Sequence, residues 1–180
     1  MSKFSIVNQV NDTLIKEMIE LDKLVFQGED IGAFDKCKEW VETNPDIYTV
    51  LTDDNKVIGY INFMPLTEKA YQMVLQGKLK DYQLASEHIN QFQSNKPLKC
   101  FLTAIAIREE YQDTEAIIEL WNGLLNKLNA LNLTISSVVA DCVSSHGEKL
   151  VKQRLDAKFI TNSNGGKIYE GNINELYHKY

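Results

Sequence analysis

The chain has 180 residues, of which 44% are hydrophobic and 24% charged, and its formal net charge is −6. Such a composition is typical of one ordinary globular domain, and it argues against a general nucleic-acid binder, because phosphate neutralisation needs a basic surface. No apolar run approaches the ~20 residues that span a bilayer, and the first residues lack a long apolar stretch. We therefore expect no membrane partner, no signal peptide and a cytoplasmic location.

The three cysteines are odd in number and far apart in the chain, at Cys37, Cys100 and Cys142. This spacing is typical of reduced thiols in a cytosol rather than of a disulfide framework. The three histidines are scattered as well, whereas a zinc site needs closely spaced Cys and His residues. The sequence therefore predicts no structural metal.

The first 63 residues predict a strand, two helices and a hairpin. Apolar residues recur at helical spacing after Asp12, an expected N-cap, and Gly28 is expected to end that helix. β-branched and aromatic residues on both sides of a polar turn indicate the hairpin. In chain order we expect a strand at 4–7, a helix from Asp12 to Gly28, a helix at 34–41, and hairpin strands at 47–51 and 57–63 around a turn at 52–55.

The remainder of the chain begins with a polar stretch at 67–96. Its apolar positions suit one or two amphipathic helices, so we interpret it as an insertion between two strands. Further on, apolar spacing predicts one long regular helix, and Gly165-Gly166 indicates a glycine turn. The expected elements are a strand at 98–107, a helix at 116–131, a strand at 134–140, a helix from Ser144 or Ser145 to about 157, and hairpin strands at 159–160 and 168–169 around 161–166.

This order of elements predicts the fold class. Strands joined by a hairpin are antiparallel, while the strand–helix–strand unit at 98–140 favours a parallel pair. We therefore expect a single α/β (α+β) domain over residues 1–180. Its sheet should be mixed, mostly antiparallel and six to seven strands wide, with helices on both faces and the insertion at 67–96 between strands 3 and 4.

Leu102–Ile107, followed by Arg108–Gln112, resembles the fourth strand and cofactor-loop entry of the GNAT superfamily of N-acetyltransferases. The order of elements is similar over nearly the whole chain. The resemblance implies acetyl-CoA as co-substrate, without a metal. It also implies that the backbone of Ile105, Ala106 and Ile107 pairs with the pantetheine arm as an added strand, and that the N–H of Ile105 or Ala106 polarises the thioester carbonyl.

In that family the next helix points its N-terminus at the pyrophosphate, across a loop that reads Gln or Arg, two residues, Gly, one residue, Gly or Ala. Here the glycines are absent, and Asp113 and Glu115 bring carboxylates, so the loop is degenerate. The local residues alone equally predict a polar turn, capped by Asp113 or Thr114, that opens a core helix. The cofactor-binding candidates in this loop are Gln112, Asp113, Thr114, Glu115, Ala116 and Ile117.

A second stretch, Asp141–Leu150, resembles the family's fifth strand and the helix after it. Ser145 stands near the position of an Asn that often contacts the cofactor, and a serine hydroxyl can also hydrogen-bond there. The general-acid tyrosine that many relatives carry in this helix has no obvious counterpart. The candidate catalytic bases are Asp141, His146 and Glu109, although His146 is equally a solvent-facing residue of a first helical turn.

The resemblance implies an N-acetyltransferase that moves an acetyl group from acetyl-CoA directly to an amine of a small molecule or peptide. The alternative is a catalytically inactive CoA-binding or protein-interaction module on the same fold, which the degenerate loop favours. The insertion at 67–96 walls the acceptor pocket, decorates the fold, or contacts a second copy in a homodimer; these alternatives stay open.

Overall fold

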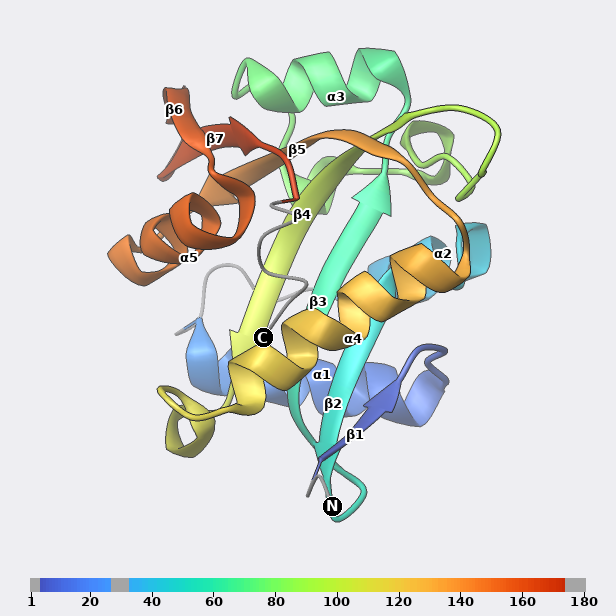
Figure 1. Ribbon diagram of the computed structural model, residues 1–180, viewed down its shortest axis with the longest axis vertical. Helices are drawn as coiled ribbons and strands as arrows, with labels where there is room; N and C mark the ends of the chain where they lie inside the picture. Colours follow the sequence, from blue (N-terminus) through green and yellow to red (C-terminus); the bar gives the residue numbers. More distant parts are fainter. Residues whose placement is uncertain (1–3, 27–32, 174–180) are drawn as a thin grey trace. The chain divides into compact units, whose positions relative to one another are not determined.

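The computed structural model describes residues 4–26 and 33–173. It confirms a mixed, mostly antiparallel seven-stranded sheet with the order β1-β2-β3-β4-β5-β7-β6, in which β4 and β5 are the parallel pair (Figure 1). The expected helix end at Gly28 lies outside the described residues. The elements are β1 (Phe4–Val7), α1 (Asp12–Val25), α2 (Phe34–Thr43), β2 (Tyr48–Asp53), β3 (Lys56–Pro65), α3 (Glu68–Leu75), β4 (Leu98–Ile107), α4 (Ala116–Ala130), β5 (Ile135–Cys142), α5 (Ser145–Leu155), β6 (Lys158–Ser163) and β7 (Gly166–Gly171).

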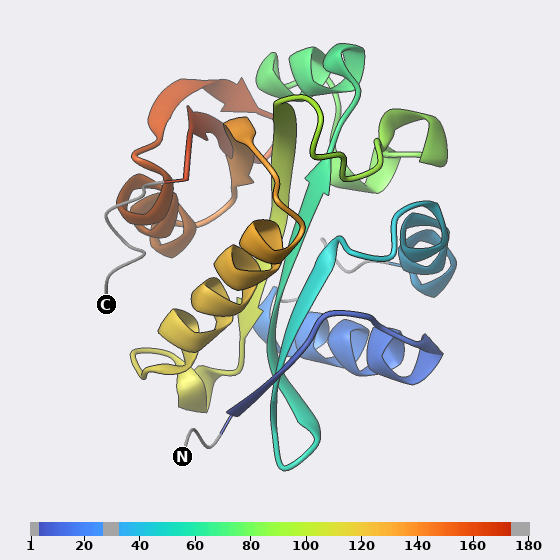
Figure 2. The same ribbon diagram turned by 45° about the vertical axis from the view of Figure 1, so that its right-hand side comes forward.

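The chain forms two compact units. The first comprises Met1–Phe63 and Ala104–Lys127, and the second comprises Met64–Thr103 and Leu128–Tyr180. In the first unit β1, β2 and β3 pair antiparallel in chain order, with α4 on one side of these strands and α1 and α2 on the other (Figure 2). All six residues of β2 are buried, since helices cover both of its faces.

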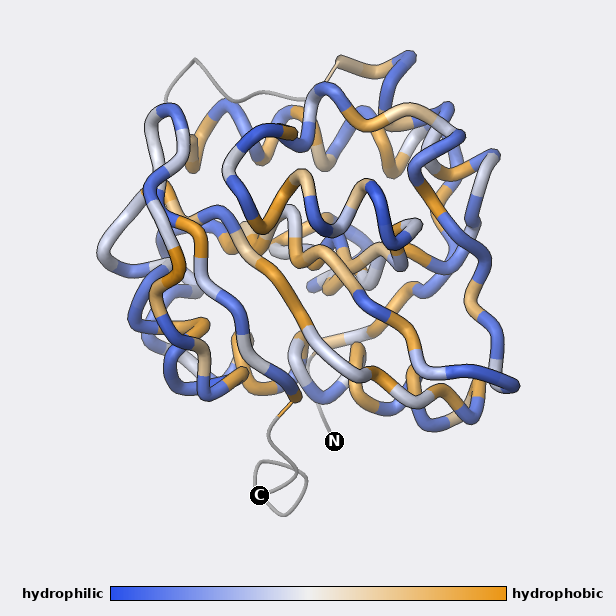
Figure 3. Tube along the Cα trace, turned by 90° about the horizontal axis from the view of Figure 1, so that it is seen from above, coloured by the Kyte–Doolittle hydropathy of each residue, from blue (hydrophilic) through white to orange (hydrophobic). Residues whose placement is uncertain are grey.

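In the second unit β7 pairs antiparallel with both β5 and β6. Two helices, α3 and α5, pack against β5 and β7. Each helix buries an apolar stripe, which includes Tyr71 and Val74 in α3 and Val151 and Leu155 in α5. Figure 3 shows the corresponding alternation of hydrophilic and hydrophobic residues along the helices.

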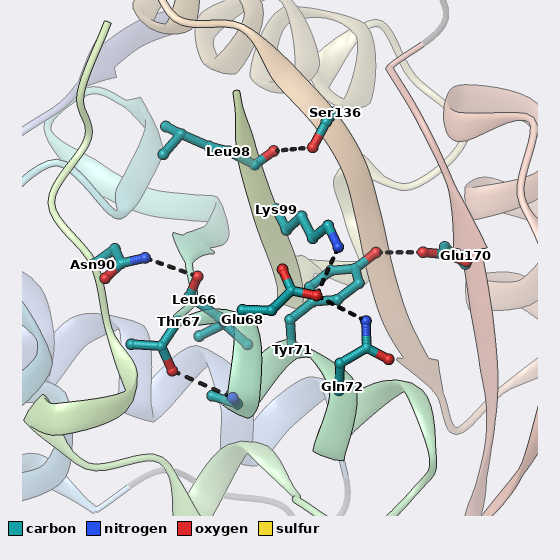
Figure 4. Close-up of polar contacts among 11 residues, drawn as sticks. Leu66, Thr67, Glu68, Tyr71, Gln72, Asn90, Leu98, Lys99, Ser136 and Glu170 are labelled. Carbon is teal, nitrogen blue, oxygen red and sulfur yellow. Dashed lines mark hydrogen bonds and ion pairs between the residues drawn. The ribbon is translucent and has the colours of Figure 1, made fainter. Parts of the chain in front are cut away.

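The insertion at 67–96 contains one α-helix, within the one or two expected, and this helix forms only its first part. Thr67 caps α3 by accepting the Ala70 N–H, and two 3₁₀ turns and extended chain follow. The Tyr71 hydroxyl donates to Glu170 Oε1 at 2.8 Å, and Lys99 Nζ lies 2.8 Å from Glu68 Oε1, so α3 is bonded to β7 and β4 (Figure 4). Burial raises the pKa of Tyr71, which keeps its hydroxyl protonated as the donor.

Both hairpin turns are shorter than the turns that the polar stretches of the sequence predicted. Asp54 and Asn55 form a two-residue turn with φ of 48° and 63°, the conformation of a type I′ turn. Asn164 and Gly165 similarly separate β6 from β7, so the strands extend through residues expected to be loop. The N-cap of α1 is Asn11 rather than Asp12, because the Asn11 side chain accepts the Leu14 N–H at 2.9 Å.

Cys37, Cys100 and Cys142 are free thiols, and all three are buried. Burial raises the pKa of Cys100, and it raises the pKa of Cys142 to about 12. In the described part of the chain, every helix is too short or too polar to cross a bilayer.

Candidate functional site

The first part of the candidate site is the C-terminal half of β4. The parallel register between β4 and β5 runs from Leu98↔Ile135 to Leu102↔Ala140, and β4 then continues to Ile107. The backbone of Ile105, Ala106 and Ile107, for which the resemblance implied donor binding, therefore lies beyond the part of β4 that is in register with β5.

The hydrogen bonds of β4 indicate an irregularity in this region. The Lys99 carbonyl accepts the Leu66 N–H just after β3, and the Arg108 N–H donates to the Ile58 carbonyl within β3. A regular strand presents backbone groups to the same neighbour only at even separations, but Lys99 and Arg108 are nine residues apart in the sequence. We infer one β-bulge in β4, which falls beyond Leu102, where the register with β5 ends.

The direction of the last β4 residues follows from contacts within the first unit. The Ala106 carbonyl oxygen would lie 3.0 Å from a Cβ added to Gly59 of β3, so Ala106 faces β3, as Arg108 does. The Ile107 carbonyl accepts from Gln112 Nε2 at 3.2 Å instead. Ile107 lies between Ala106 and Arg108, so by strand alternation its backbone groups point away from β3.

Side-chain hydrogen bonds from its own residues hold the loop from β4 to α4 in place. Arg108 Nε donates to the Val57 carbonyl at 3.0 Å, and the Tyr111 hydroxyl donates to Asp53 Oδ2 at 2.7 Å. Thr114 Oγ1 donates to the Tyr111 carbonyl at 2.6 Å and accepts the Ala116 N–H at 3.2 Å. Asp113 adopts the left-handed conformation, with φ of 58°, which Asp tolerates better than most residues.

Helix α4 begins at the end of this loop. The Glu119 N–H donates to the Glu115 carbonyl at 2.9 Å, so the N–H groups of Ile117 and Ile118 precede the first intrahelical bond. These two N–H groups and the helix dipole suit an anion. Thr114 thus accepts the Ala116 N–H ahead of the first intrahelical bond, and the predicted helix follows.

The side chains around this helix start do not suit a diphosphate. Asp113 and Glu115 are exposed, as are Glu109 and Glu110, and Ile118 is 43% exposed on the first turn. Within residues 4–26 and 33–173, none of these four carboxylates forms an ion pair. The loop therefore offers backbone donors to an anion but surrounds them with negative charge.

The second unit holds Asp141, Ser145 and His146, and the Asp141 carboxylate is bonded to two side chains. Lys80 Nζ lies 2.6 Å from Asp141 Oδ2, and Ser163 donates from Oγ to Asp141 Oδ1 at 2.7 Å. Lys80 Nζ also lies 3.2 Å from Ser163 Oγ, and the side chains of Lys80 and Asp141 are only 15% and 10% exposed. Asp141 thus joins the end of β5 to the insertion and to β6 as one polar cluster.

The remaining predicted residues sit at the start of α5 and in the loop of the first unit. Ser144 is the N-cap of α5, since its hydroxyl accepts the Gly147 N–H at 3.1 Å, and Ser145 and His146 are exposed in the first turn. Glu109 is exposed in a 3₁₀ turn before α4. Asp141 and His146 thus belong to the second unit and Glu109 to the first. Among the described residues no group of three or more His, Cys, Asp or Glu side chains could hold a metal ion.

Sequence reasoning missed Lys80 and Ser163, the partners of Asp141. They are 61 and 22 residues from it in the sequence, so no local spacing relates them. One local signal precedes Lys80: Gly77, with φ of 70°, ends α3, and the Lys78 N–H then bonds the Met73 carbonyl at 2.8 Å. The chain leaves α3 at this glycine and reaches Lys80 three residues later.

No protein-family model matches the chain, and no curated protein matches it in sequence. Several solved structures match in fold. The GNAT-like decarboxylase GphF in complex with isobutyryl-CoA is 13% identical, with a TM-score of 0.68 over 94% of this chain and 100% of that chain. The loading GNATL domain of CurA from Lyngbya majuscula is 12% identical, with a TM-score of 0.62 over 95% and 98%. Arabidopsis thaliana Naa50 in complex with the bisubstrate analogue CoA-Ac-MVNAL is 9% identical, with a TM-score of 0.60 over 96% and 100%.

These similarities extend over nearly the whole chain. The resemblance stated from the sequence is confirmed at the level of fold: the chain has the fold of the GNAT N-acetyltransferases.

Proposed function

We propose that the protein transfers an acetyl group from acetyl-CoA, or a related acyl thioester, directly to an amine of a small molecule or peptide. The observation that carries this function is the end of β4, where backbone groups lie beyond the register with β5 and lead through a capped loop to α4. The similar structures GphF and Naa50 contain an acyl-CoA and a CoA bisubstrate analogue, which supports a thioester donor.

The chemical step is direct transfer in a ternary complex. The lone pair of the neutral amine attacks the thioester carbonyl carbon, so a C–N bond forms while the C–S bond breaks. The electron pair of the C–S bond leaves on the thiolate. The amine loses one proton to a base or to water, and the thiolate gains one, so the products are an amide and a free thiol.

The geometry favours Ile105 over Ala106 as the donor that polarises the thioester carbonyl. The backbone of Ala106 is directed at β3, and Ile105 is the other residue whose N–H the resemblance implied for this role. Removing one such donor typically lowers kcat by roughly 100- to 1,000-fold. Asp141, His146 and Glu109 remain candidates for the base, with Asp141 bonded to Lys80 and Ser163.

The test is thiol release from acetyl-CoA across a panel of small amines and N-terminal peptides. Ile105→Pro removes the backbone N–H of Ile105 and should lower kcat/KM by about 100-fold, and circular dichroism and the unfolding temperature are measured beside it, because proline within a strand also disturbs the strand. Its matched control, Ile105→Ala, keeps the N–H and should retain most activity. Equal activity of Ile105→Pro and the unchanged protein would exclude this backbone group from catalysis.

An inactive binding module on the same fold is the second candidate, favoured by the acidic loop and by the engagement of Asp141. It predicts CoA binding in calorimetry with no thiol release above the uncatalysed rate for any amine. Turnover of one amine well above that rate would remove this candidate.

A further inference from the structure

The charge around the start of α4 bears on which thioester the protein uses. Between Arg108 and Glu119 the sequence carries five carboxylates and one arginine, a net charge of −4. Asp53 lies against the same loop, where Tyr111 donates to it. Arg108 Nε is turned toward the Val57 carbonyl of β3, so the one cation of the segment is bonded to backbone.

Coenzyme A carries a diphosphate and a further phosphate on its nucleotide half, whereas its pantetheine arm is uncharged. The backbone donors at Ile117 and Ile118 favour an anion, as does the charge of Arg108, whose guanidinium is held to the Val57 carbonyl through Nε. Close approach to these backbone donors is hindered, because a β-branched side chain stands at each position and Glu115 immediately precedes the helix. Like charges at these separations repel, and salt weakens that repulsion.

The pantetheine arm meets different chemistry. Beyond Leu102 the register of β4 with β5 ends, and the backbone of Ile107 points away from β3; main-chain hydrogen bonds to an added strand need no charge. Within the first unit, β4 thus offers hydrogen bonds to the pantetheine arm, whereas the carboxylates of the loop repel the nucleotide phosphates.

Resting on the function proposed above, we infer that the protein recognises its donor by the pantetheine thioester alone and gains nothing from the phosphates of CoA. The substrate class is therefore the acyl-pantetheine thioesters, including short uncharged ones, with acetyl-CoA as one usable member rather than the preferred one.

A salt series separates this inference from a conventional phosphate site. With a reactive amine, kcat/KM is measured for acetyl-CoA and for S-acetylpantetheine between about 20 and 300 mM salt. We expect the two donors to agree within about tenfold, and kcat/KM for acetyl-CoA to rise with salt, because screening relieves repulsion. S-acetylpantetheine should show no salt dependence. A preference for acetyl-CoA above about 100-fold, lost as salt rises, would overturn the inference.

Matched variants test the loop itself. Asp113→Asn/Glu115→Gln removes two charges conservatively, since Asn also tolerates the left-handed conformation of Asp113. It should raise kcat/KM for acetyl-CoA about threefold or more at low salt and leave S-acetylpantetheine unchanged. Glu42→Gln on α2, an exposed carboxylate on the opposite side of the strands from α4, is the control and should change neither donor. Equal effects of the two variants would contradict a local role for the loop.

If no amine is acetylated, a measurement of donor binding still tests the inference. Calorimetry with CoA and with pantetheine should then give similar affinities, which would remove the proposed transferase activity but retain donor recognition through the arm. CoA binding more than about 100-fold tighter than pantetheine, or no binding of either at millimolar concentration, would overturn the inference.

Discussion

The loop before α4 and the cluster at the end of β5 place carboxylates in opposite environments. Asp113 and Glu115 are exposed and form no ion pair within the described residues, while Asp141 is largely buried between Lys80 and Ser163. Exposed charges contribute little to stability, but they act on charged ligands at a distance. A buried ion pair affects stability instead, because removing one charge leaves the other buried without an opposite charge beside it. We therefore expect the loop to act on charged ligands and the cluster to contribute to the stability of the second unit.

Asp141→Ala should give the largest effect on stability. It leaves the Lys80 ammonium buried without its carboxylate, which typically costs about 3–5 kcal/mol of unfolding free energy. Urea denaturation followed by circular dichroism measures this loss. The double variant Lys80→Met/Asp141→Leu removes both charges and should recover most of it. A loss below about 1 kcal/mol for Asp141→Ala would mean that the cluster is effectively solvated.

Lys127 is a buried ionisable residue of the first unit, to be compared with Asp141 of the second. Its Nζ donates to the Tyr48 carbonyl at 2.7 Å, and burial lowers its pKa to about 8, against a smaller opposing effect of Asp46. The folded state thus binds fewer protons than the unfolded state between pH 8 and about 10.4, so stability should rise with pH across that window. The gain is at most about 3 kcal/mol.

The measurement for Lys127 is the difference in unfolding free energy between the unchanged protein and Lys127→Met at pH 7 and pH 9.5. Comparison with the variant cancels the titration of other groups. The difference should move in favour of the unchanged protein as pH rises, whereas a difference that does not depend on pH would show that Lys127 is charged in the fold.

Thr114→Ala tests the capped turn of the loop. The variant loses the hydroxyl that accepts the Ala116 N–H and donates to the Tyr111 carbonyl, so we expect about 1 kcal/mol of destabilisation. Thermal unfolding provides the measurement, and Thr114→Ser, which keeps the hydroxyl, is the control. If both variants are equally destabilised, the methyl group rather than the hydroxyl matters.

Glu115→Gln should give the smallest change in stability, within about 0.5 kcal/mol, because the side chain is exposed. Set beside Asp141→Ala, it contrasts two carboxylates of opposite role in one assay. A destabilisation by Glu115→Gln comparable to that of Asp141→Ala would remove the distinction between the two regions.

The sequence predicted best where local pattern and burial agree. The apolar run of β4 is bounded by Pro97 and Arg108, and the strand has the predicted ends, Leu98 and Ile107. The insertion was harder, because Leu79, Leu84 and Ile89 are buried at positions outside α-helices. Apolar spacing alone does not distinguish an amphipathic helix from a loop that packs its apolar residues on a core.

The candidate site likewise has one part that the sequence predicted and one part that it did not. The loop residues 112–117 are contiguous, so the sequence could place them together at the start of a helix. The Lys80–Asp141–Ser163 cluster depends on long-range packing of the insertion against β5 and β6, which no local pattern contains. The β-bulge inferred in β4 likewise rests on hydrogen bonds to β3 that no local pattern contains.

The buried thiols have a practical consequence for labelling. A maleimide reacts with an accessible thiolate, and Cys37, Cys100 and Cys142 offer none while the protein is folded. A cysteine engineered into the exposed Asp54–Asn55 turn could therefore carry a fluorophore in the otherwise unmodified protein. The native thiols would in turn report global opening, since their modification rate follows the fraction of molecules that have lost their fold.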